Sequence, residues 1–323
     1  MKVLVTGAAG FVAAHLMDLL RQEEPDAEVY GLARPHGAPA EVPGRVTVIE
    51  ADLLDAAGVA AAVELAKPDR IVHLAAQSSP QRSWTDPEGT YRTNVIGALN
   101  LLEAARKCRT PPRVLLVGSA EEYGLASPSE IPLREEAPLR PNSPYAVSKI
   151  SQGYVGLQYA LVYGLPVLRT RTFHHTGPGR GEMFAESSFA RQIAEIELGL
   201  RDPVLSVGNL DAIRDFTDVR DVVRAYWALL ERGESGEVYN VCSGRGQRIR
   251  DLLGLLIEAS GVRVDIRVDK GRLRPSDIPV LVGDPDKLRR ATGWEPRIPL
   301  DRTLRDLLSD WRARLGGRPS GAR

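Results

Sequence analysis

Cysteine is nearly absent from the sequence, which limits the ways in which the fold can be held together. Only Cys108 and Cys242 occur in the 323 residues, far apart, without CxxC spacing and in apolar segments. This pattern favours buried reduced thiols over a disulfide or a zinc site, and a reducing cytoplasm is the simplest location for them. Folding must therefore depend on apolar cores, which 43% hydrophobic residues can supply.

An excess of charge and long apolar runs are absent as well. Lys and Arg total 42 and so do Asp and Glu, which gives a formal net charge of zero. Without a broad field to attract nucleic acid or an anionic membrane, any anion site must be local. No run is long enough to cross a bilayer, and Met1 is not followed by the regions of a secretion signal, so neither membrane insertion nor secretion is expected.

Histidine, the commonest metal ligand, is also scarce. The five histidines are His15, His36, His73, His174 and His175, and none has metal-ligand spacing with carboxylates or thiols. We therefore expect no catalytic metal.

The sequence does contain an alternation of short apolar runs with longer amphipathic segments. The short runs are nearly all apolar, as in strands of a parallel sheet that helices cover on both faces. The predicted strands are Lys2–Thr6, Glu28–Ala33, Val46–Glu50, Arg70–Leu74, Arg113–Gly118 and Pro166–Arg171. This order predicts an α/β fold with a Rossmann-type doubly wound parallel sheet.

The first predicted strand runs directly into a glycine-rich turn that opens an amphipathic helix. Gly7 permits the tight turn, Gly10 lets the backbone approach a pyrophosphate at the helix N-terminus, and the small Ala13 lets the helix pack on the strand. A plain strand-to-helix turn is the alternative. The flanking strand and helix favour a dinucleotide site.

The ends of the second and third strands bear on the choice of dinucleotide. An NAD site usually has an acidic residue here to bind the ribose 2′-hydroxyl, but this strand ends at Ala33 and is followed by Arg34. Since a guanidinium suits a 2′-phosphate, Arg34 favours NADP(H), with NAD(H) as the alternative. We expect Asp52, after the third strand, to bond the adenine amine.

Tyr145 and Lys149 lie four residues apart in SPYAVSK, at a predicted helix start with Ser143 as cap and Pro144 in the first turn. Both side chains therefore share one helix face. Tyrosine is a poor acid or base near neutrality because its pKa is about 10, but a neighbouring ammonium lowers that pKa. We expect Lys149 to do this and to hold the nicotinamide ribose hydroxyls.

Ser119 follows the fifth predicted strand in VGSAEEYG. That is the carboxyl edge of the sheet, where ligands of open α/β folds bind, and its hydroxyl can bond a carbonyl oxygen that is being reduced. A serine that only forms a turn is the alternative. Together with Tyr145 and Lys149, Ser119 predicts hydride transfer between a nicotinamide dinucleotide and a carbonyl.

The motifs TGAAGF, HLAA, GSAEEYG and PYAVSK, in this order and spacing, resemble the extended short-chain dehydrogenase/reductase family of nucleotide-sugar enzymes. The resemblance spans almost the whole chain and implies a catalytic triad of Ser119, Tyr145 and Lys149. The residues that it and the loop pattern assign to the cofactor are Gly7, Gly10, Phe11, Val12, Arg34, Asp52, Leu53, Leu74, Ala75, Ala76, Asn94, Tyr145, Lys149 and Phe173.

The regular alternation of predicted strands and helices stops after about residue 172. One more predicted helix and strand follow near 218–242. We therefore expect interleaved domains: a dinucleotide-binding domain of residues 1–172 plus 218–242, and a smaller α/β lobe of 173–217 plus 243–315 for the nucleotide sugar. The final residues 316–323 are expected to be a flexible tail.

Within the family, RTFHHTGPG, VGNLDAIRDFTDVRDVVRAYW and LRPSDIPVLVGD are similar to the GDP-6-deoxy-D-mannose (GDP-D-rhamnose) reductases. This resemblance implies that NAD(P)H reduces the 4-keto group of GDP-4-dehydro-6-deoxy-D-mannose. The residues assigned to this GDP-linked substrate are Ser79, Glu121, His174, Arg191, Arg214, Arg274, Ser276 and Asp277.

Arg191, Arg214 and Arg274 fall in the second lobe, where a neutral protein needs local positive charge for a diphosphate. A solvated surface position is the alternative for each. The resemblance implies that Ser276 and Asp277, close to Arg274, contact the nucleotide ribose.

Two residues leave the reaction open. Glu121 lies where related GDP-mannose 4,6-dehydratases place a base, so its carboxylate can serve catalysis by removing a C5 proton, and a 4,6-dehydratase or a 4-epimerase is the alternative to a reductase. His174 stands where asparagine is usual, which leaves room for a changed 4-keto substrate. A non-catalytic dinucleotide-binding protein is a third alternative.

The resemblance also implies a homodimer. The long predicted helices near Tyr91–Cys108 and Pro144–Tyr163 are expected to form a four-helix interface, although their apolar faces can equally be covered within one chain.

Overall fold

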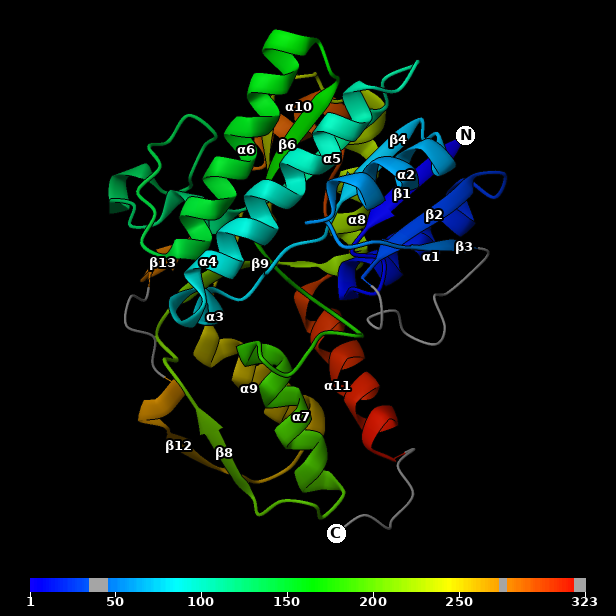
Figure 1. Cartoon of the computed structure of the whole chain (residues 1–323). Coiled ribbons are helices and arrows are strands. Elements are labelled where there is room, and N and C mark those ends of the chain that lie inside the picture. The colour runs from blue at the N-terminus through cyan, green and yellow to red at the C-terminus, as the bar shows by residue number, and fades with distance from the viewer. Residues whose placement is uncertain (35–45, 273–277, 317–323) are drawn as a thin grey trace.

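The computed structural model describes residues 1–34, 46–272 and 278–316. A parallel sheet covered by helices forms the larger part, and a smaller group of short strands and three helices lies beside the carboxyl end of the sheet (Figure 1). In the described part of the chain, no helix is long and apolar enough to cross a membrane.

Seven strands form the large sheet in the order β10-β6-β5-β4-β1-β2-β3, and every pairing between neighbours is parallel. The strand order reverses between β1 and β4, and open α/β sheets bind ligands at such a switch point. The strands are β1 (Lys2–Thr6), β2 (Glu28–Ala33), β3 (Val46–Glu50), β4 (Arg70–His73), β5 (Arg113–Ser119), β6 (Val167–Thr172) and β10 (Val238–Val241). The predicted Rossmann-type sheet is confirmed.

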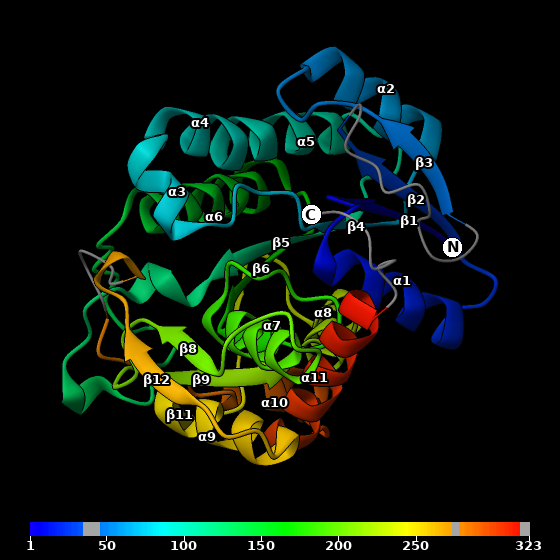
Figure 2. The ribbon, with the colours of Figure 1, turned by 90° about the horizontal axis from the view of Figure 1, so that it is seen from below.

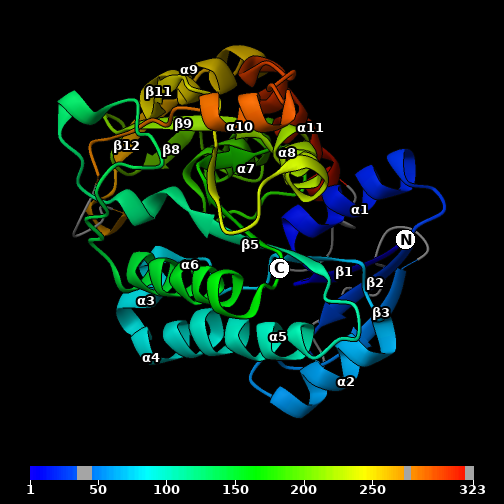
Figure 3. The same ribbon diagram turned by 90° about the horizontal axis from the view of Figure 1, so that it is seen from above.

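Helices cover both faces of this sheet, which explains why its strands are apolar throughout (Figure 2). Val3 and Val5 of β1 point into one core, with α1 and α8, whereas Leu4 points into the other, with α2 and α5. The helices are α1 (Phe11–Glu23), α2 (Ala56–Ala66), α5 (Gly97–Arg106), α6 (Pro144–Tyr163), α8 (Val219–Arg232) and α10 (Asp286–Thr292). Figure 3 shows α5 and α6 side by side on the same face.

The smaller part is built around a third core, where Phe189 of α7, Leu252 of α9 and Leu307 of α11 are buried. Its helices are α7 (Ala185–Glu197), α9 (Ile249–Ser260) and α11 (Leu300–Gly316). Its strands form one group of β11, β9, β13 and β7 and a separate pair of β12 and β8. They are β7 (His174–Thr176), β8 (Val204–Val207), β9 (Ile213–Asp218), β11 (Gly246–Arg248), β12 (Asp265–Val268) and β13 (Val280–Leu281).

Short elements complete the connections. They are α3 (Pro80–Thr85), α4 (Pro87–Tyr91), the π-helical turn η1 (Arg92–Ile96), and the 3₁₀ turns η2 (Ala120–Tyr123), η3 (Pro128–Glu130) and η4 (Lys270–Arg272). Both cysteines are free thiols, as expected from the sequence.

Asp215 of β9 holds two loops of the smaller part. Its buried carboxylate accepts hydrogen bonds from Ser243 N at 2.8 Å, Ser243 Oγ at 2.6 Å, Gly244 N at 2.9 Å and Gly283 N at 3.4 Å. Burial raises the pKa of this carboxyl, and the four donors oppose that effect. The bonds fix β9, and with it the neighbouring Arg214, against the loops that follow β10 and β13.

We predict that Asp215→Ala lowers the free energy of unfolding by about 3 kcal/mol, because three backbone N–H groups lose their acceptor inside the fold. Urea unfolding followed by circular dichroism measures this. Asp202→Ala, at an exposed position, serves as the control and should change stability by less than about 0.5 kcal/mol. Equal stability of the two variants would contradict the role given to Asp215.

Candidate active site

The glycine-rich turn lies between the ends of β1 and β4. Gly7 has a φ of 71° and donates its N–H to Leu32 O at 2.9 Å, and Gly10 caps α1 while donating to Gly7 O at 2.9 Å. A Cβ on Gly7 would lie 2.9 Å from both Cα and N of Ala75. Only glycine therefore fits this turn, and the N-terminus of α1 stays open to an anion such as a pyrophosphate.

The sheet register brings the other predicted cofactor residues to the same edge. Thr6 is the partner of Leu32 in β2 and of His73 in β4, and Ala33 is the partner of Glu50 in β3. The segments that follow these strand ends therefore lie in a row. They hold the exposed Arg34, the exposed Asp52, the buried Leu53 and the half-buried Leu74, Ala75 and Ala76.

Asn94 connects this edge to α6. It is fully buried, its Oδ1 accepts from Gln77 N at 2.8 Å, and its Nδ2 donates to Gln77 O at 3.1 Å and to Ser148 Oγ at 2.9 Å. These bonds fix the loop after β4 against the helix that bears Tyr145. Asn94 therefore shapes the predicted cofactor site through the main chain.

Two other predicted cofactor residues differ in their surroundings. The Phe11 ring stacks on His175 at a centroid distance of 6.2 Å, whereas the Phe173 ring is 2% exposed and packs beside Tyr123. Val12 packs against the first core. The ring of Phe173 belongs to a core cluster, so its assignment to the cofactor stays a prediction.

Tyr145 and Lys149 lie at the start of α6, where Ser143 Oγ accepts from Ala146 N at 3.1 Å and Pro144 occupies the first turn, as predicted. Both side chains are buried. The Lys149 ammonium donates to Val117 O and to Gln152 Oε1, each at 2.9 Å. These bonds hold the ammonium beside the carboxyl end of β5.

Ser119 ends β5 and caps the turn η2. Its Oγ accepts from Glu121 N at 3.2 Å, which leaves the hydroxyl proton available for another acceptor. The Ser119 hydroxyl on β5 lies close enough to Tyr145 on α6 to lower the pKa of the phenol. The three predicted catalytic side chains are therefore gathered at the carboxyl edge of the sheet, beside the glycine-rich turn.

The electrostatics of Tyr145 differ from the sequence expectation. Burial raises the pKa of the phenol well above its usual value; the Ser119 hydroxyl opposes this, and the charges of Glu121 and Glu122 add to it. Arg180 is a cation whose charge lowers this pKa, and the same effect of Lys149 stays a prediction. Burial also lowers the pKa of Lys149 to about 8.

Arg180 is a site residue that sequence reasoning missed. Its guanidinium lies 5.1 Å from the centre of the Phe11 ring and 3.3 Å from that of Phe184, and its Nε is 3.6 Å from Glu186 Oε1. It thus lies between the N-terminus of α1 and Tyr145. The only signal in the sequence is the preceding Gly177-Pro178-Gly179 turn, which gives no direction to the side chain.

The predicted substrate arginines have different surroundings. Arg214 on β9 is 6% exposed and donates from Nη1 to Ile213 O at 2.9 Å. Arg191 on α7 is paired with Glu195, at 2.7 Å, and with Glu182. Arg191 is thus already balanced by carboxylates. Arg274, Ser276 and Asp277 lie outside the described residues.

The remaining substrate candidates lie on the two sides of the site. Ser79 caps α3, with its Oγ accepting from Arg82 N at 3.2 Å. His174 lies on β7 opposite Phe216 of β9, and the two ring centres are 5.5 Å apart. Glu121 is half-buried in η2, close enough to Tyr145 to influence its pKa.

Two histidines near the site, the buried His73 and the half-buried His175, have uncharged rings at neutral pH. Burial lowers the pKa of both His73 and His175 to about 3. His73 Nδ1 is 2.8 Å from Thr6 Oγ1, and His175 Nδ1 is 3.0 Å from Phe173 O. Within residues 1–34, 46–272 and 278–316, no three His, Cys, Asp or Glu side chains form a group that can hold a metal ion.

Comparison with known proteins identifies relatives that match nearly the whole chain. The family model described as GDP-mannose 4,6 dehydratase matches residues 4–307. GDP-6-deoxy-D-mannose reductase of Pseudomonas aeruginosa is 38% identical over 97% of this chain and 98% of its own. GDP-mannose 4,6-dehydratase of Yersinia enterocolitica is 30% identical over 95% of this chain and 93% of its own.

Solved structures share the same architecture. RMD from Pseudomonas aeruginosa, complexed with NADPH, has a TM-score of 0.84 at 37% identity, covering 97% of this chain and 100% of its own. UDP-glucose 4-epimerase of Thermus thermophilus, in complex with NAD, has a TM-score of 0.86 at 30% identity, covering 97% of this chain and 99% of its own.

We predict that Gly7→Ala lowers the free energy of unfolding by about 1–3 kcal/mol, because a side chain at this φ is strained and its Cβ meets Ala75. Gly254→Ala is the matched control, since Gly254 lies in α9 with open space around it and should gain up to about 1 kcal/mol. Chemical denaturation compares the two. A tolerated alanine at position 7 would refute the tight turn.

Proposed function

Since the chain belongs to the GDP-mannose 4,6-dehydratase family of extended short-chain dehydrogenases/reductases, we propose that it reduces the 4-keto group of GDP-4-dehydro-6-deoxy-D-mannose. The protein is an NAD(P)-dependent oxidoreductase that acts on a nucleotide sugar. The product of the proposed reaction is GDP-6-deoxy-D-mannose (GDP-D-rhamnose). One observation carries the proposal, namely 38% identity to a GDP-6-deoxy-D-mannose reductase over 97% of this chain.

The reaction needs a hydride and a proton. The reduced nicotinamide, when bound, supplies the hydride to C4 of the sugar. Tyr145 supplies the proton to the 4-oxygen, and because burial raises its pKa, the phenol carries that proton at neutral pH. The O–H of Ser119 donates to the same oxygen while negative charge develops there.

The dinucleotide fits the row of strand ends described above. Gly7 and Gly10 leave room for a pyrophosphate at the N-terminus of α1, and Asp52 and Lys149 are the proposed partners of the adenine and of the nicotinamide ribose. We assign NADP(H) as the preferred form because Arg34 follows β2 where an NAD site has a carboxylate. The proposed reaction uses no metal.

The sugar nucleotide is proposed to lie between the two parts of the chain. Ser79 and Glu121 come from the larger part, and His174, Arg191 and Arg214 from the smaller part. Arg214 is the strongest candidate for the diphosphate, since it is buried on a strand that Asp215 fixes. Arg274, Ser276 and Asp277 retain their proposed roles toward the nucleotide.

A homodimer through α5 and α6 is part of the proposal. Apolar side chains on α6 and on η1 are exposed in the single chain, with exposed fractions of 45% for Ile96, 58% for Tyr154 and 74% for Leu161. Pairing α5 and α6 with the same helices of a second copy would bury them.

A 4,6-dehydratase is the second candidate, favoured by Glu121 near Tyr145 and by the 30% identical dehydratase. A dehydratase returns its dinucleotide to the starting state in each turnover, whereas a reductase consumes one NAD(P)H per ketone. Net loss of the 340 nm absorbance therefore separates them.

We predict that Tyr145→Phe lowers kcat for ketone reduction by about 10²–10⁴-fold, because the proton donor is lost while the ring remains. The measurement is NADPH oxidation with the 4-keto sugar nucleotide. Tyr154→Phe, on an exposed position of the same helix, should keep full turnover. Unchanged turnover in Tyr145→Phe, or no NADPH oxidation by the unaltered protein, would refute the mechanism or the function respectively.

We also predict that Arg34→Ala raises the KM for NADPH about 10–100-fold and leaves the KM for NADH nearly unchanged, because only NADPH has a 2′-phosphate. Arg109→Ala, far from the carboxyl edge, is the control. An equal rise of the KM for NADPH and the KM for NADH would show that Arg34 does not bind the 2′-phosphate.

A further inference from the structure

Glu122 is a buried carboxylate next to Ser119 of the proposed catalytic triad. The reaction proposed above assigns no role to it. Glu122 lies in η2 and is 5% exposed. Its Oε1 accepts from Ser119 N at 2.9 Å, and its Oε2 accepts from Arg171 Nε at 3.1 Å. Burial raises the pKa of this carboxyl, and Arg171 and the Ser119 N–H oppose that effect by favouring the carboxylate.

The end of β5 brings Glu122 and Lys149 to the same strand edge. The pairing of β4 with β5 ends at His73 and Leu116, so β5 continues beyond its neighbour. The N–H of Val114 donates to Pro166 O, next to β6. Because the N–H and C=O groups of successive residues face opposite edges of a strand, those of Val117 and Ser119 face β4. The Lys149 ammonium donates to Val117 O, and the Glu122 carboxylate accepts from Ser119 N.

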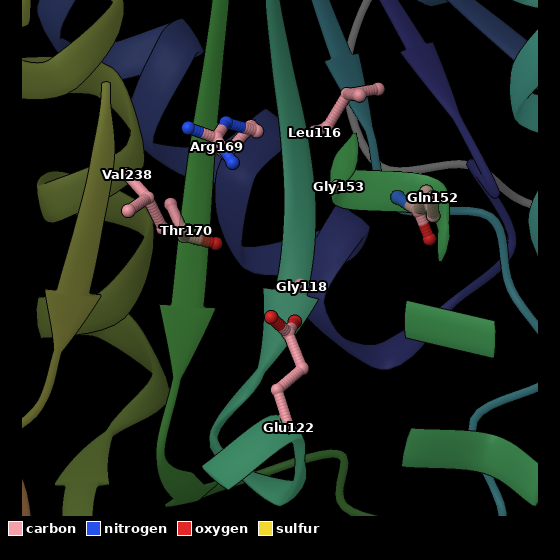
Figure 4. Close-up of a pocket in the computed structure, with 8 residues that line it drawn as sticks. All are labelled: Leu116, Gly118, Glu122, Gln152, Gly153, Arg169, Thr170 and Val238. Atoms are coloured by element: carbon pink, nitrogen blue, oxygen red, sulfur yellow. The ribbon is translucent and has the colours of Figure 1, made fainter. Parts of the chain in front are cut away.

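A small cavity lies beside the Glu122 side chain. Its volume is about 10 Å³, room for about one water molecule, and Gly118, Glu122, Gln152 and Arg169 are among the residues that line it. Figure 4 shows the Glu122 carboxylate beside Gly118, at the end of β5. A Cβ on Gly118 would lie 2.5 Å from Glu122 Oε1, so glycine is needed for this approach.

Charged and titratable groups reach Lys149 from each element around it. Glu122 of η2 raises the pKa of Lys149, which burial otherwise lowers. His73 of β4 is neutral, because its pKa falls to about 3, and Tyr145 of α6 keeps its proton. On β6, Arg171 is paired with Glu122, and Arg169 donates to Gly236 O at 2.7 Å. Glu122 is therefore the anion that balances the buried ammonium.

We propose that Glu122 is a positioning residue of the catalytic triad, whose carboxylate holds the Ser119 main chain and supplies the counter-charge of the Lys149 ammonium. The proposal rests on the hydride-transfer function proposed above. Glu122 acts through Ser119 and Lys149 and does not touch the reacting atoms.

Glu122→Gln separates this role from that of a simple helix cap. The glutamine Oε1 can still accept from Ser119 N and so preserves the cap, whereas the negative charge is lost. Glu136→Gln removes a charge from a nearby exposed position and is the matched control.

The first experiment follows the titration of Lys149 itself and needs no turnover. The chain has six lysines, at positions 2, 67, 107, 149, 270 and 287, so the signal of Lys149 in a ¹³C-lysine-labelled sample is identified by its loss in Lys149→Arg. We predict that Glu122→Gln moves the titration midpoint of Lys149 down by about one pH unit, and that Glu136→Gln leaves it in place. An unmoved midpoint in Glu122→Gln overturns the proposal, whether or not the protein reduces the proposed ketone.

The second experiment is the pH profile of kcat for ketone reduction. Its alkaline limb should move to lower pH in Glu122→Gln, and Glu122→Asp, which keeps the charge, should restore most of the original profile. A uniform fall of kcat at every pH in Glu122→Gln would indicate a structural role alone and would overturn the proposal. If Glu122→Gln fails to fold by circular dichroism, the titration of Lys149 in Glu122→Met, which also removes the charge, decides, with a downward shift in support and an unmoved midpoint against.

Discussion

Parallel pairing of seven strands, with helices on both faces, is the constraint on which the rest of the molecule depends. Parallel strands end at a common edge, and their register aligns Thr6, Leu32 and His73. The turns that follow these ends must therefore lie together, however far apart they are in the sequence. The glycine-rich turn, the segment of Asp52 and Ser119, the proposed catalytic serine, all occupy this edge as a result.

Much of this arrangement could be predicted from the sequence because its signals are local. Apolar runs predicted the six central strands, and Ser143 with Pro144 predicted the start of α6. The strands of the smaller part were not predicted individually, since each has two to six residues and forms only through distant partners, as β13 does with β9. The roles of Arg180 and Glu122 escaped prediction for a similar reason, because tertiary contacts alone aim their side chains.

The electrostatics of the site show where spacing alone is insufficient. A spacing of four positions places Tyr145 and Lys149 on one helix face, and this led to the expectation that the ammonium lowers the pKa of the phenol. In the structure Lys149 turns to Val117 O and Gln152, while burial dominates the pKa of Tyr145. A phenol that keeps its proton suits a reductase, which must donate one.

The chain crosses between its two parts five times, from β6 to β7, from β9 to α8, from β10 to β11, from β13 to α10 and from α10 to α11. Any movement of the smaller part relative to the sheet must bend all five connections together. A fragment that stopped after β6 would also lack β10 and α8, leaving one edge of the sheet unpaired and part of one core exposed. Neither part is therefore one continuous segment that could be separated from the other at a single point of the chain. The two parts must fold together, and must change together in evolution.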